Sequence, residues 1–337
     1  MKIFICQTPF QLYYTNRLVH CFNEESNKAI NFIIIHSGLC ITNEEWIPNV
    51  SFIKFNGSTS KLKNIAQILN IKNSIHKLIL ENDKQELDFY VPHIGGLLAN
   101  YIYFNKKIEE KKNIHFNLYY EGVLYFYDFQ ERLQIFHLTR FILSLCLGHR
   151  YRYCKTIFPY NSEKLKHIYT PLKKFTKGSK DKIKEISFPS IEKDITDIHN
   201  NKSVFLVLGG PVDYIKEFYK KSLEEIVQKN ISQPKIYYKG HASFQTHNKN
   251  YKEIFSSIAE EFGVEYIEIT EQLPIEKLFV DINPDVIYSY YSSALLNIKI
   301  ISGNKCSIKC YISERHKLAD ELEKVFQHFQ IEINLIK

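Results

Sequence analysis

The sequence lacks the long apolar segments that would carry it across a membrane. No run of about eighteen apolar residues occurs, so we expect no membrane-spanning helix. The apolar start, residues 2–6, is brief and no cleavage site follows it, which argues against a secretory signal peptide. Because 45% of the 337 residues are hydrophobic and 24% are charged, the sequence instead predicts a globular protein with a sizeable core.

Cysteine and histidine are present without a pattern of pairing or metal binding. The seven cysteines form no paired framework, and Cys306 and Cys310 have no second pair to complete a zinc site. Reduced thiols in a cytoplasmic protein are the simplest interpretation. No metal ligand set is expected from His115, His149 or His247 either.

The net charge of the protein excludes few classes of binding partner but favours anionic ones. A net charge of +7 fits a protein that meets anionic ligands or an anionic membrane surface. The basic residues are scattered among acids and form no nucleic-acid motif, so no nucleic acid partner is expected. We interpret the lysine-rich run 173–184 as a solvated linker rather than a lipid patch, and the apolar segment 136–147 as a buried helix rather than a membrane-contacting one.

Apolar runs of strand length alternate with helical patterns along most of the chain. This alternation predicts largely parallel sheets with helices on both faces. In the first half, strand patterns lie at 2–6, 31–36, 50–55, 87–91 and 114–120, with helices at 10–22, at 61–82 and from 97 onward. In the second half, strand patterns lie at 203–208, 235–238, 264–269, 286–290 and 309–312, with helices at 214–228, 251–262, 274–279, from 294 onward and at 319–329.

The polar stretch 172–202 divides the chain into two predicted domains. We expect an N-terminal, acceptor-side domain over residues 1–195 and a C-terminal, nucleotide-sugar-binding domain over 203–337. The expected fold class is α/β, with two Rossmann-like βαβ domains facing each other across a cleft. In such folds the ligand lies between the carboxyl ends of the strands.

The chemically informative residues follow two strands of the second half. Lys239-Gly240-His241 ends one strand, and a histidine in that place can move a proton near neutral pH. Ser292 and Ser293 lie where another strand gives way to an apolar helix. Hydroxyls and free N–H groups at a helix start bind phosphate well. A proton donor beside a phosphate site suggests a transferase that uses a nucleotide donor.

These segments resemble, in order, the motifs of bacterial GT-B sialyltransferases. Lys239-Gly240-His241 resembles their Lys-x-His-Pro motif, residues 274–278 (PIEKL) resemble Pro-x-Glu-x-Leu, and Ser292-Ser293 resembles Ser-Ser/Thr. Tyr120-Glu121-Gly122 looks like a reduced form of their paired-acid-and-glycine motif. The N-terminal Thr8-Pro9-x-Gln11 looks like the opening of the lipooligosaccharide sialyltransferase family, which is glycosyltransferase family 52-like.

Two positions depart from the family pattern. Ala242 replaces the proline after the histidine, and only one acid, Glu121, precedes Gly122. These departures leave open a different sugar donor.

The resemblance implies how the donor is held. His241 would donate a proton or hydrogen bond to the leaving phosphate, while Ser292 and Ser293 hold its oxygens. Glu276 would accept the ribose hydroxyls. The other expected substrate-binding residues are Lys239, Gly240, Gly209, Gly210 and Gln11.

Two acids compete for the role of the base that activates the acceptor hydroxyl. Glu121 ends a strand of the first half and matches the acidic motif of the family. Asp213 follows the first strand of the second half, where the lipooligosaccharide group implies an aspartate base. We give a slight preference to Asp213.

Each candidate also has a purely structural interpretation. A strand-end histidine is more often structural than catalytic, serines and aspartates cap helices, and a glycine pair can simply form a tight turn. These readings apply to His241, to Ser292, Ser293 and Asp213, to Gly209 and Gly210, to Glu276 as a first-turn helix acid, and to Glu121 as the partner of a lysine.

The function that combines these features is an inverting, metal-independent sialyltransferase. It would move sialic acid from CMP-sialic acid to a terminal galactose of lipooligosaccharide or capsular glycan, without a cofactor, in the cytoplasm. Peripheral contact with the inner membrane and a homodimer are left open. The alternatives are a GT-B transferase with another donor, such as CMP-Kdo or a nucleoside-diphosphate sugar, and a non-catalytic nucleotide- or sugar-binding protein.

Overall fold

The protein divides into two compact units, Met1–Ser187 and Phe188–Lys337, which are considered one at a time. The computed structural model describes the whole chain apart from residues 27–28, 37–45, 55–60, 83, 106–107, 109, 112, 128–129, 131–132, 147, 149, 189–202, 211, 230, 232–233, 241–247, 272, 304, 316–317 and 337. For residues 61–68, 136, 146, 248 and 249 only the backbone is described.

The first unit is built on a seven-stranded parallel sheet in the order β3-β2-β1-β4-β5-β6-β7. Its central strands are rich in Ile and Phe because both faces are covered by helices. The strands are β1 (Lys2–Cys6), β2 (Phe32–His36), β3 (Val50–Lys54), β4 (Leu87–Val91), β5 (Ile114–Tyr119), β6 (Leu165–Thr170) and β7 (Ile183–Glu185).

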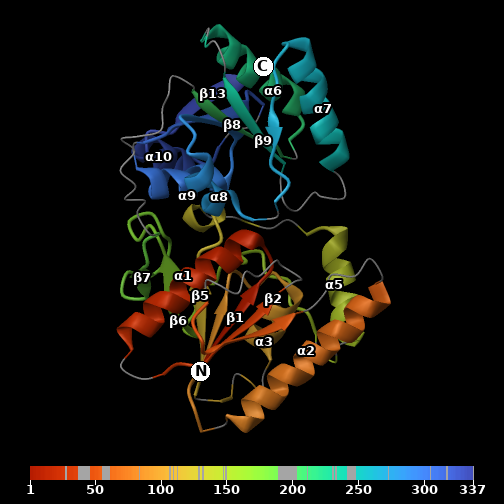
Figure 1. Ribbon diagram of the computed structural model, residues 1–337. Helices are drawn as coiled ribbons and strands as arrows, with labels where there is room; N and C mark the ends of the chain where they lie inside the picture. Colours follow the sequence, from red (N-terminus) through yellow and green to blue (C-terminus); the bar gives the residue numbers. More distant parts are fainter. Residues whose placement is uncertain are drawn as a thin grey trace. The chain divides into compact units, whose positions relative to one another are not determined.

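Helices cover the two faces of this sheet (Figure 1). The crossover after β1 places α1 (Pro9–Glu25) on one face, and the return crossover from β3 to β4 places α2 (Lys61–Glu81) on the other. There α2 meets α3 (Leu97–Phe104) through a hydrogen bond between His76 and Tyr101. A 3₁₀ turn, η2 (Val123–Phe126), and α5 (Ile135–Cys146) follow β5.

The second unit has the same kind of architecture, with a six-stranded parallel sheet in the order β10-β9-β8-β11-β12-β13. The strands are β8 (Val204–Leu208), β9 (Lys235–Lys239), β10 (Ile267–Glu268), β11 (Val286–Tyr290), β12 (Ser307–Ser313) and β13 (Glu332–Ile336). The helices are α6 (Ile215–Gln228), α7 (Asn248–Glu261), α8 (Ile275–Ile282), α9 (Ser293–Ser302) and α10 (Asp320–His328).

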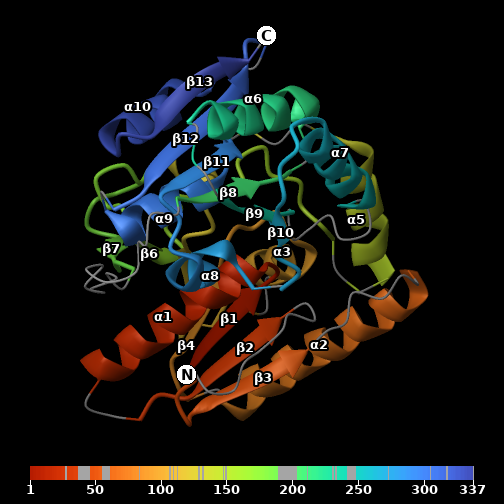
Figure 2. The same ribbon diagram turned by 45° about the horizontal axis from the view of Figure 1, so that its top comes forward.

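The core of the second unit is aromatic where α6 and α7 pack side by side on the sheet (Figure 2). Tyr238 of β9 stacks on Phe255 of α7 with ring centroids 4.3 Å apart, and its hydroxyl lies 3.0 Å from that of Tyr219 on α6. Stacked and edge-on rings bury large areas in defined geometries, so this cluster fixes the crossing of both helices over the strands.

Both sheets reverse their strand order at one point. In the first unit the reversal lies between β1 and β4, and in the second between β8 and β11. At such a switch the connections leave in opposite directions, and a crevice opens outside the carboxyl ends of the strands. The segments that follow these strands are therefore where ligand chemistry is expected.

The boundary between the units falls earlier than the predicted domain limits of 195 and 203. Residues 172–187, expected as the start of a linker, instead carry β7, which pairs with β6 through Ile183, Lys184 and Glu185. A short strand with only one apolar residue escapes a periodicity test. Residues 189–202 lie outside the described part of the chain, and the cleft between the two domains stays a prediction.

Two further expectations differ from the structure. The segment expected to be a buried helix is α5, but its outward face exposes aliphatic side chains such as Ile135. The predicted strand 264–269 forms only the two-residue β10. In the described part of the chain, no helix has both the length and the apolar character needed to cross a bilayer.

Candidate functional site

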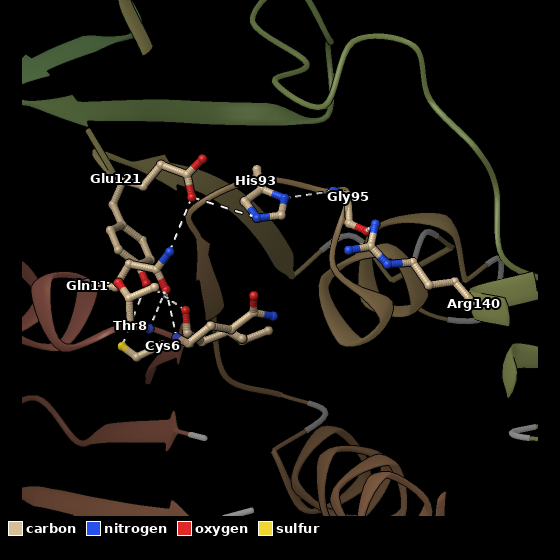
Figure 3. Close-up of polar contacts among 10 residues, drawn as sticks. Cys6, Thr8, Gln11, His93, Gly95, Glu121 and Arg140 are labelled. Carbon is tan, nitrogen blue, oxygen red and sulfur yellow. Dashed lines mark hydrogen bonds and ion pairs between the residues drawn. The ribbon is translucent and has the colours of Figure 1, made fainter. Parts of the chain in front are cut away.

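In the first unit, a carboxylate stands at the carboxyl end of the sheet between two polar partners (Figure 3). Glu121 lies two residues after the end of β5 and its side chain is 9% exposed. The Nε2 amide of Gln11, at the start of α1, donates to Glu121 Oε2 at 3.2 Å. The imidazole Nε2 of His93, just after β4, lies 3.7 Å from the same oxygen. Three segments separated in sequence therefore converge on one carboxylate.

The position of Gln11 follows from how α1 begins. Thr8 is the N-cap and Pro9 opens the helix, as the sequence predicted. The Thr8 hydroxyl accepts from the Gln11 backbone N–H at 3.2 Å, while the Gln11 side-chain oxygen accepts from the N–H groups of Gln7 at 2.7 Å and Thr8 at 3.3 Å. This capping box engages the amide oxygen, so the amide NH₂ is the group that faces Glu121.

The turn after β4 orients His93. The backbone N–H of Gly95 donates to His93 Nδ1 at 3.0 Å, so Nδ1 acts as an acceptor. In the neutral ring this assigns the proton to Nε2, on the side of Glu121. The turn itself is held from α5, because Arg140 donates to the Gly95 carbonyl at 2.9 Å, and the Tyr151 hydroxyl donates to it at 3.1 Å.

Burial sets the electrostatics of this group. Removing the Glu121 carboxylate from water raises its pKa above the usual glutamate value, while the electrostatic interaction with His93 and the hydrogen bond from Gln11 act in the opposite direction. A carboxylate whose pKa is moved towards neutrality accepts a proton more readily than an exposed one. The arrangement can therefore take a proton from a hydroxyl placed at this edge of the sheet.

In the second unit, a buried polar group lies beside the end of β9. Glu276, in the first turn of α8, is 4% exposed, and its Oε1 accepts from Asn297 Nδ2 of α9 at 2.7 Å. Burial raises the pKa of Glu276, and the Asn297 hydrogen bond and the charge of Lys239 oppose the rise. Lys239 is itself buried, which lowers its pKa, and its ammonium donates to the Glu271 carbonyl at 2.7 Å.

The two serines stand at the start of α9, and Tyr291 separates them from the end of β11. Ser292 is the N-cap and its hydroxyl accepts from the Ala294 N–H at 3.2 Å, whereas Ser293 is the first helical residue. The structural interpretation of Ser292 as a cap is thus observed. Helix N-termini nevertheless leave further N–H groups directed outward, and these attract phosphate.

The glycines after β8 have a packing reason to be glycine. A Cβ on Gly210 would lie 2.1 Å from Tyr290 Cε1, and one on Gly209 would lie 2.4 Å from the Tyr219 hydroxyl. The tyrosines therefore fill the space that a side chain would need. Close backbone approach by a ligand is not required to explain Gly209 and Gly210.

The remaining candidates are placed less favourably or lie outside the description. Asp213 is exposed in the turn before α6, and its side chain does not cap that helix. Gly240 is the last residue described before His241, and His241 and Ala242 themselves lie within the segment 241–247, outside the described residues. Tyr120, which precedes Glu121 in the acidic motif, is 0% exposed and packs edge-on against Tyr14 in the core.

Two polar residues of these groups were not predicted from the sequence. Nothing in the sequence links His93 to Glu121, because β4 and β5 must first pair. Asn297 has no sequence signal at all. Among the described residues, no group of three or more histidines, cysteines or acids could hold a metal ion.

Comparison with known proteins identifies the family. The family model of the alpha-2,8-polysialyltransferases (POLYST) matches residues 2–311. The chain belongs to this family. No curated protein sequence matches it. Membership makes the chain a glycosyltransferase of the sialyltransferase kind, which confirms the expected enzyme class and sets aside the non-catalytic alternative.

Solved structures confirm the GT-B fold of this polysialyltransferase family member. The GT-B domain of a sialyltransferase from Photobacterium damselae matches with a TM-score of 0.54 at 12% identity, covering 99% of this chain and 100% of that one. A 2,6-sialyltransferase from Vibrionaceae Photobacterium sp. JT-ISH-224, in a ternary complex with CMP and lactose, matches with a TM-score of 0.55 at 14% identity, covering 99% and 78%. A putative UDP-N-acetylglucosamine 2-epimerase from Listeria monocytogenes matches with 0.57 at 9% identity, covering 98% and 83%. At such identities the likeness concerns the fold alone.

Proposed function

We propose that this protein transfers sialic acid from CMP-sialic acid to the hydroxyl of a glycan acceptor, with inversion, and that Glu121 is the base. The observation that carries the proposal is the buried Glu121 carboxylate, which Gln11 and His93 hold at the carboxyl end of the first sheet. Asp213 is the weaker candidate because its side chain is exposed.

The proposed step is a single displacement. The acceptor oxygen forms a bond to the anomeric carbon as the bond from that carbon to the CMP phosphate breaks, and CMP leaves with the bonding electron pair. The proton of the acceptor hydroxyl passes to Glu121. The orientation of His93, with Nε2–H towards the carboxylate, stabilises the ionised form that must be present at the start.

The polar residues of the second unit are proposed to hold the nucleotide. Glu276 would accept hydrogen bonds from ribose hydroxyls, and the start of α9 at Ser292 and Ser293 would take the phosphate. The ammonium of Lys239 lies beside this group and adds positive charge. His241 is proposed to donate a proton or hydrogen bond to the leaving phosphate. No metal or cofactor has a role in this step.

The family match favours a sialic acid as the acceptor sugar. The sequence alone suggested a terminal galactose, and one structural neighbour was solved with lactose bound. The family description names an alpha-2,8 linkage between sialic acids. We therefore propose a sialic-acid-terminated glycan as the preferred acceptor, with a galactose-terminated glycan as the second candidate.

A donor and acceptor matrix tests the proposal. The purified protein is incubated with CMP-sialic acid, CMP-Kdo or UDP-sugars, against lactose, sialyllactose and short oligosialic acids, with and without a chelator. We expect turnover with CMP-sialic acid only, preferentially on sialylated acceptors, unchanged by the chelator, and a product linkage and anomeric configuration readable by NMR. Turnover with a UDP-sugar but not with CMP-sialic acid would overturn the donor assignment. A preference for lactose would favour a galactose-terminated glycan as the acceptor.

A further inference from the structure

Helix α5 exposes a stripe of aliphatic side chains to solvent. Ile135 is 85% exposed, Leu138 60%, Ile142 54% and Leu145 54%. Their spacing of three, four and three residues places them on one face of the helix. The opposite face carries buried polar groups, among them Ser144 at 0% exposure. The helix is thus amphipathic with its apolar side outward, the reverse of a helix that packs on its own core.

Such a stripe is not an ordinary surface feature. Single exposed aliphatic residues are common, but contiguous ones mark a surface that binds another protein, a ligand or a membrane. Within the described residues, the stripe accounts for four of the eleven large hydrophobic side chains that are prominently exposed, and Leu133 and Tyr153 lie close to it in sequence.

A basic pocket adjoins the stripe. It has a volume of about 870 Å³ and lies between α2, α3, α5 and the segment that follows α5. Among the described residues that line it, none is acidic. Phe141 of α5 forms part of its wall, and Leu138 and Leu145 lie three and four positions away on the same helix surface. Its positive and titratable side chains are Lys72, His76, Arg150 and Arg152.

The two arginines are positioned for an external anion. Neither guanidinium forms an ion pair with a residue in the described part of the chain, and both residues are exposed. Arg150 lies over the Phe141 ring at 5.9 Å, and Arg152 lies over the Phe104 ring at 5.1 Å. The aromatic rings support the stems and planes of these side chains while the charged ends remain accessible.

We propose that the outward face of α5, together with the basic pocket, is a docking surface for a bilayer that contains anionic phospholipids. The aliphatic stripe would enter the boundary between headgroups and acyl chains, and the pocket cations would bind the phosphates of the headgroups beside it. Tyr153, an aromatic residue that is 38% exposed at the pocket, fits the interfacial belt. The charge of the pocket selects this occupant over a second copy of the chain, whose net charge is also positive at +7.

Vesicle binding of the full-length protein tests the apolar part and does not depend on turnover. Leu138→Asn with Ile142→Asn is compared with a matched pair in the second unit, Val227→Asn with Leu335→Asn, whose side chains are 42% and 68% exposed. Vesicles are made of phosphatidylcholine with or without phosphatidylglycerol. We expect the α5 pair to weaken binding to the anionic vesicles by about tenfold or more, and the control pair to bind like the wild type.

The basic part is tested with Arg150→Gln and Arg152→Gln. We expect these changes to weaken binding to anionic vesicles by roughly tenfold or more at low salt and to reduce its salt dependence. Lys173→Gln with Lys174→Gln is the matched control, because these exposed lysines belong to the other basic segment of the first unit. A loss of binding in the lysine variant but not in the arginine variant would overturn the proposal.

Two further measurements, the depth of insertion into the bilayer and the oligomeric state, distinguish membrane docking from a protein–protein interface. A tryptophan at position 138 (Leu138→Trp) should blue-shift on adding anionic vesicles and be quenched by brominated acyl chains, whereas one at position 335 (Leu335→Trp) should not. Circular dichroism and melting temperature confirm that each variant is folded. If light scattering shows that Leu138→Asn with Ile142→Asn turns a dimer into a monomer while vesicle binding is absent in the wild type, the stripe is a protein interface and the proposal fails.

Discussion

At the scale of single residues, the proposed identity of the base rests on one carboxylate with two polar neighbours. Glu121 is buried and its pKa is raised by that burial, whereas Gln11 and His93 stabilise its charged form. Burial makes the carboxylate more basic, and the two polar neighbours act against that rise in its pKa. Sequence reasoning found Glu121 through its motif but could not rank it above Asp213, because burial and hydrogen bonding depend on strands that are far apart along the chain.

The first prediction concerns the base itself. Glu121→Gln keeps the size of the side chain and removes its basicity, so we expect kcat to fall by about 10²–10⁴-fold while the affinity for CMP stays unchanged. Steady-state kinetics and calorimetric titration with CMP measure the two quantities. Asp213→Asn is the matched control and should retain most of the activity. The reverse pattern, with Asp213→Asn inactive, would transfer the role of base to Asp213.

The second prediction concerns the pH dependence of activity. The electrostatic interaction with His93 lowers the pKa of Glu121, so the loss of the imidazole in His93→Asn lets that pKa rise further. The base must be deprotonated to act, and a higher pKa moves the acidic limb of the kcat profile to higher pH. We expect the variant to lose activity near neutrality and to recover part of it in more alkaline buffer. A uniform loss at every pH would instead indicate a structural role for the imidazole.

At the scale of secondary-structure elements, the start of α1 has two roles, because the Gln11 side chain both caps the helix and donates a hydrogen bond to Glu121. Gln11→Glu should preserve the capping box, since a carboxylate accepts the same N–H bonds from Gln7 and Thr8. It removes the donor to Glu121 and places a like charge beside it, which raises the Glu121 pKa. We therefore expect near-normal stability with an acidic limb displaced to higher pH, measured by thermal unfolding and by the pH profile. Gln11→Ala should lose the cap as well, at a cost of about 1 kcal/mol.

The turn after β8 gives a prediction about stability. A methyl group at Gly210 would overlap the Tyr290 ring, so Gly210→Ala should destabilise the protein by about 1–3 kcal/mol. Truncation of the ring in Tyr290→Ala makes room for that methyl group. The double variant should therefore lose less than the sum of the single variants, as a double-mutant cycle in urea would show. Additive losses would mean that Gly210 is required for another reason.

Most of the elements were predictable because each carries a local signal. The strands β1, β4 and β11 and the helix α2 coincide with their predicted ranges to within one residue. The sequence analysis did not predict β6, β7 and β13. Their residues alternate weakly or are polar, and they form strands because an existing sheet edge offers hydrogen bonds to them.

The site was predictable only in part, for a related reason. Motifs with local spacing indicated Gln11, Glu121, Glu276 and the serines at the start of α9. The pairing of Glu121 with His93 and of Glu276 with Asn297 depends on which strands and helices become neighbours. The exposed face of α5 could not be predicted either, because an apolar pattern shows which residues share a face and not what that face meets.

At the scale of the whole molecule, the protein consists of two units with separate sheets and separate cores. Each sheet has its own reversal of strand order and its own polar group at the strand ends, so the tasks of activating the acceptor and holding the donor are proposed for different units. A ligand that binds only one unit should stabilise that unit selectively.

Calorimetry tests this division of tasks. We expect two unfolding transitions, of which CMP at about one hundred times its dissociation constant shifts only the one of the second unit, by about 2.7 kcal/mol of stability. Glu276→Gln should weaken that shift, and Glu121→Gln should leave it intact. A CMP-induced shift confined to the first unit would contradict the assignment of the nucleotide site.

The hydrogen bond between Arg140 and the Gly95 carbonyl has one more consequence. Arg140 projects from the inner side of α5, and Gly95 in turn supplies the N–H that orients His93 (Figure 3). A helix lying on a lipid surface would thus be two hydrogen bonds away from the imidazole beside Glu121, the proposed base. We therefore expect the rate of turnover to change when liposomes are added, even for a small water-soluble acceptor. This would be a form of interfacial activation in which the Arg140 guanidinium connects α5 to the turn that orients His93.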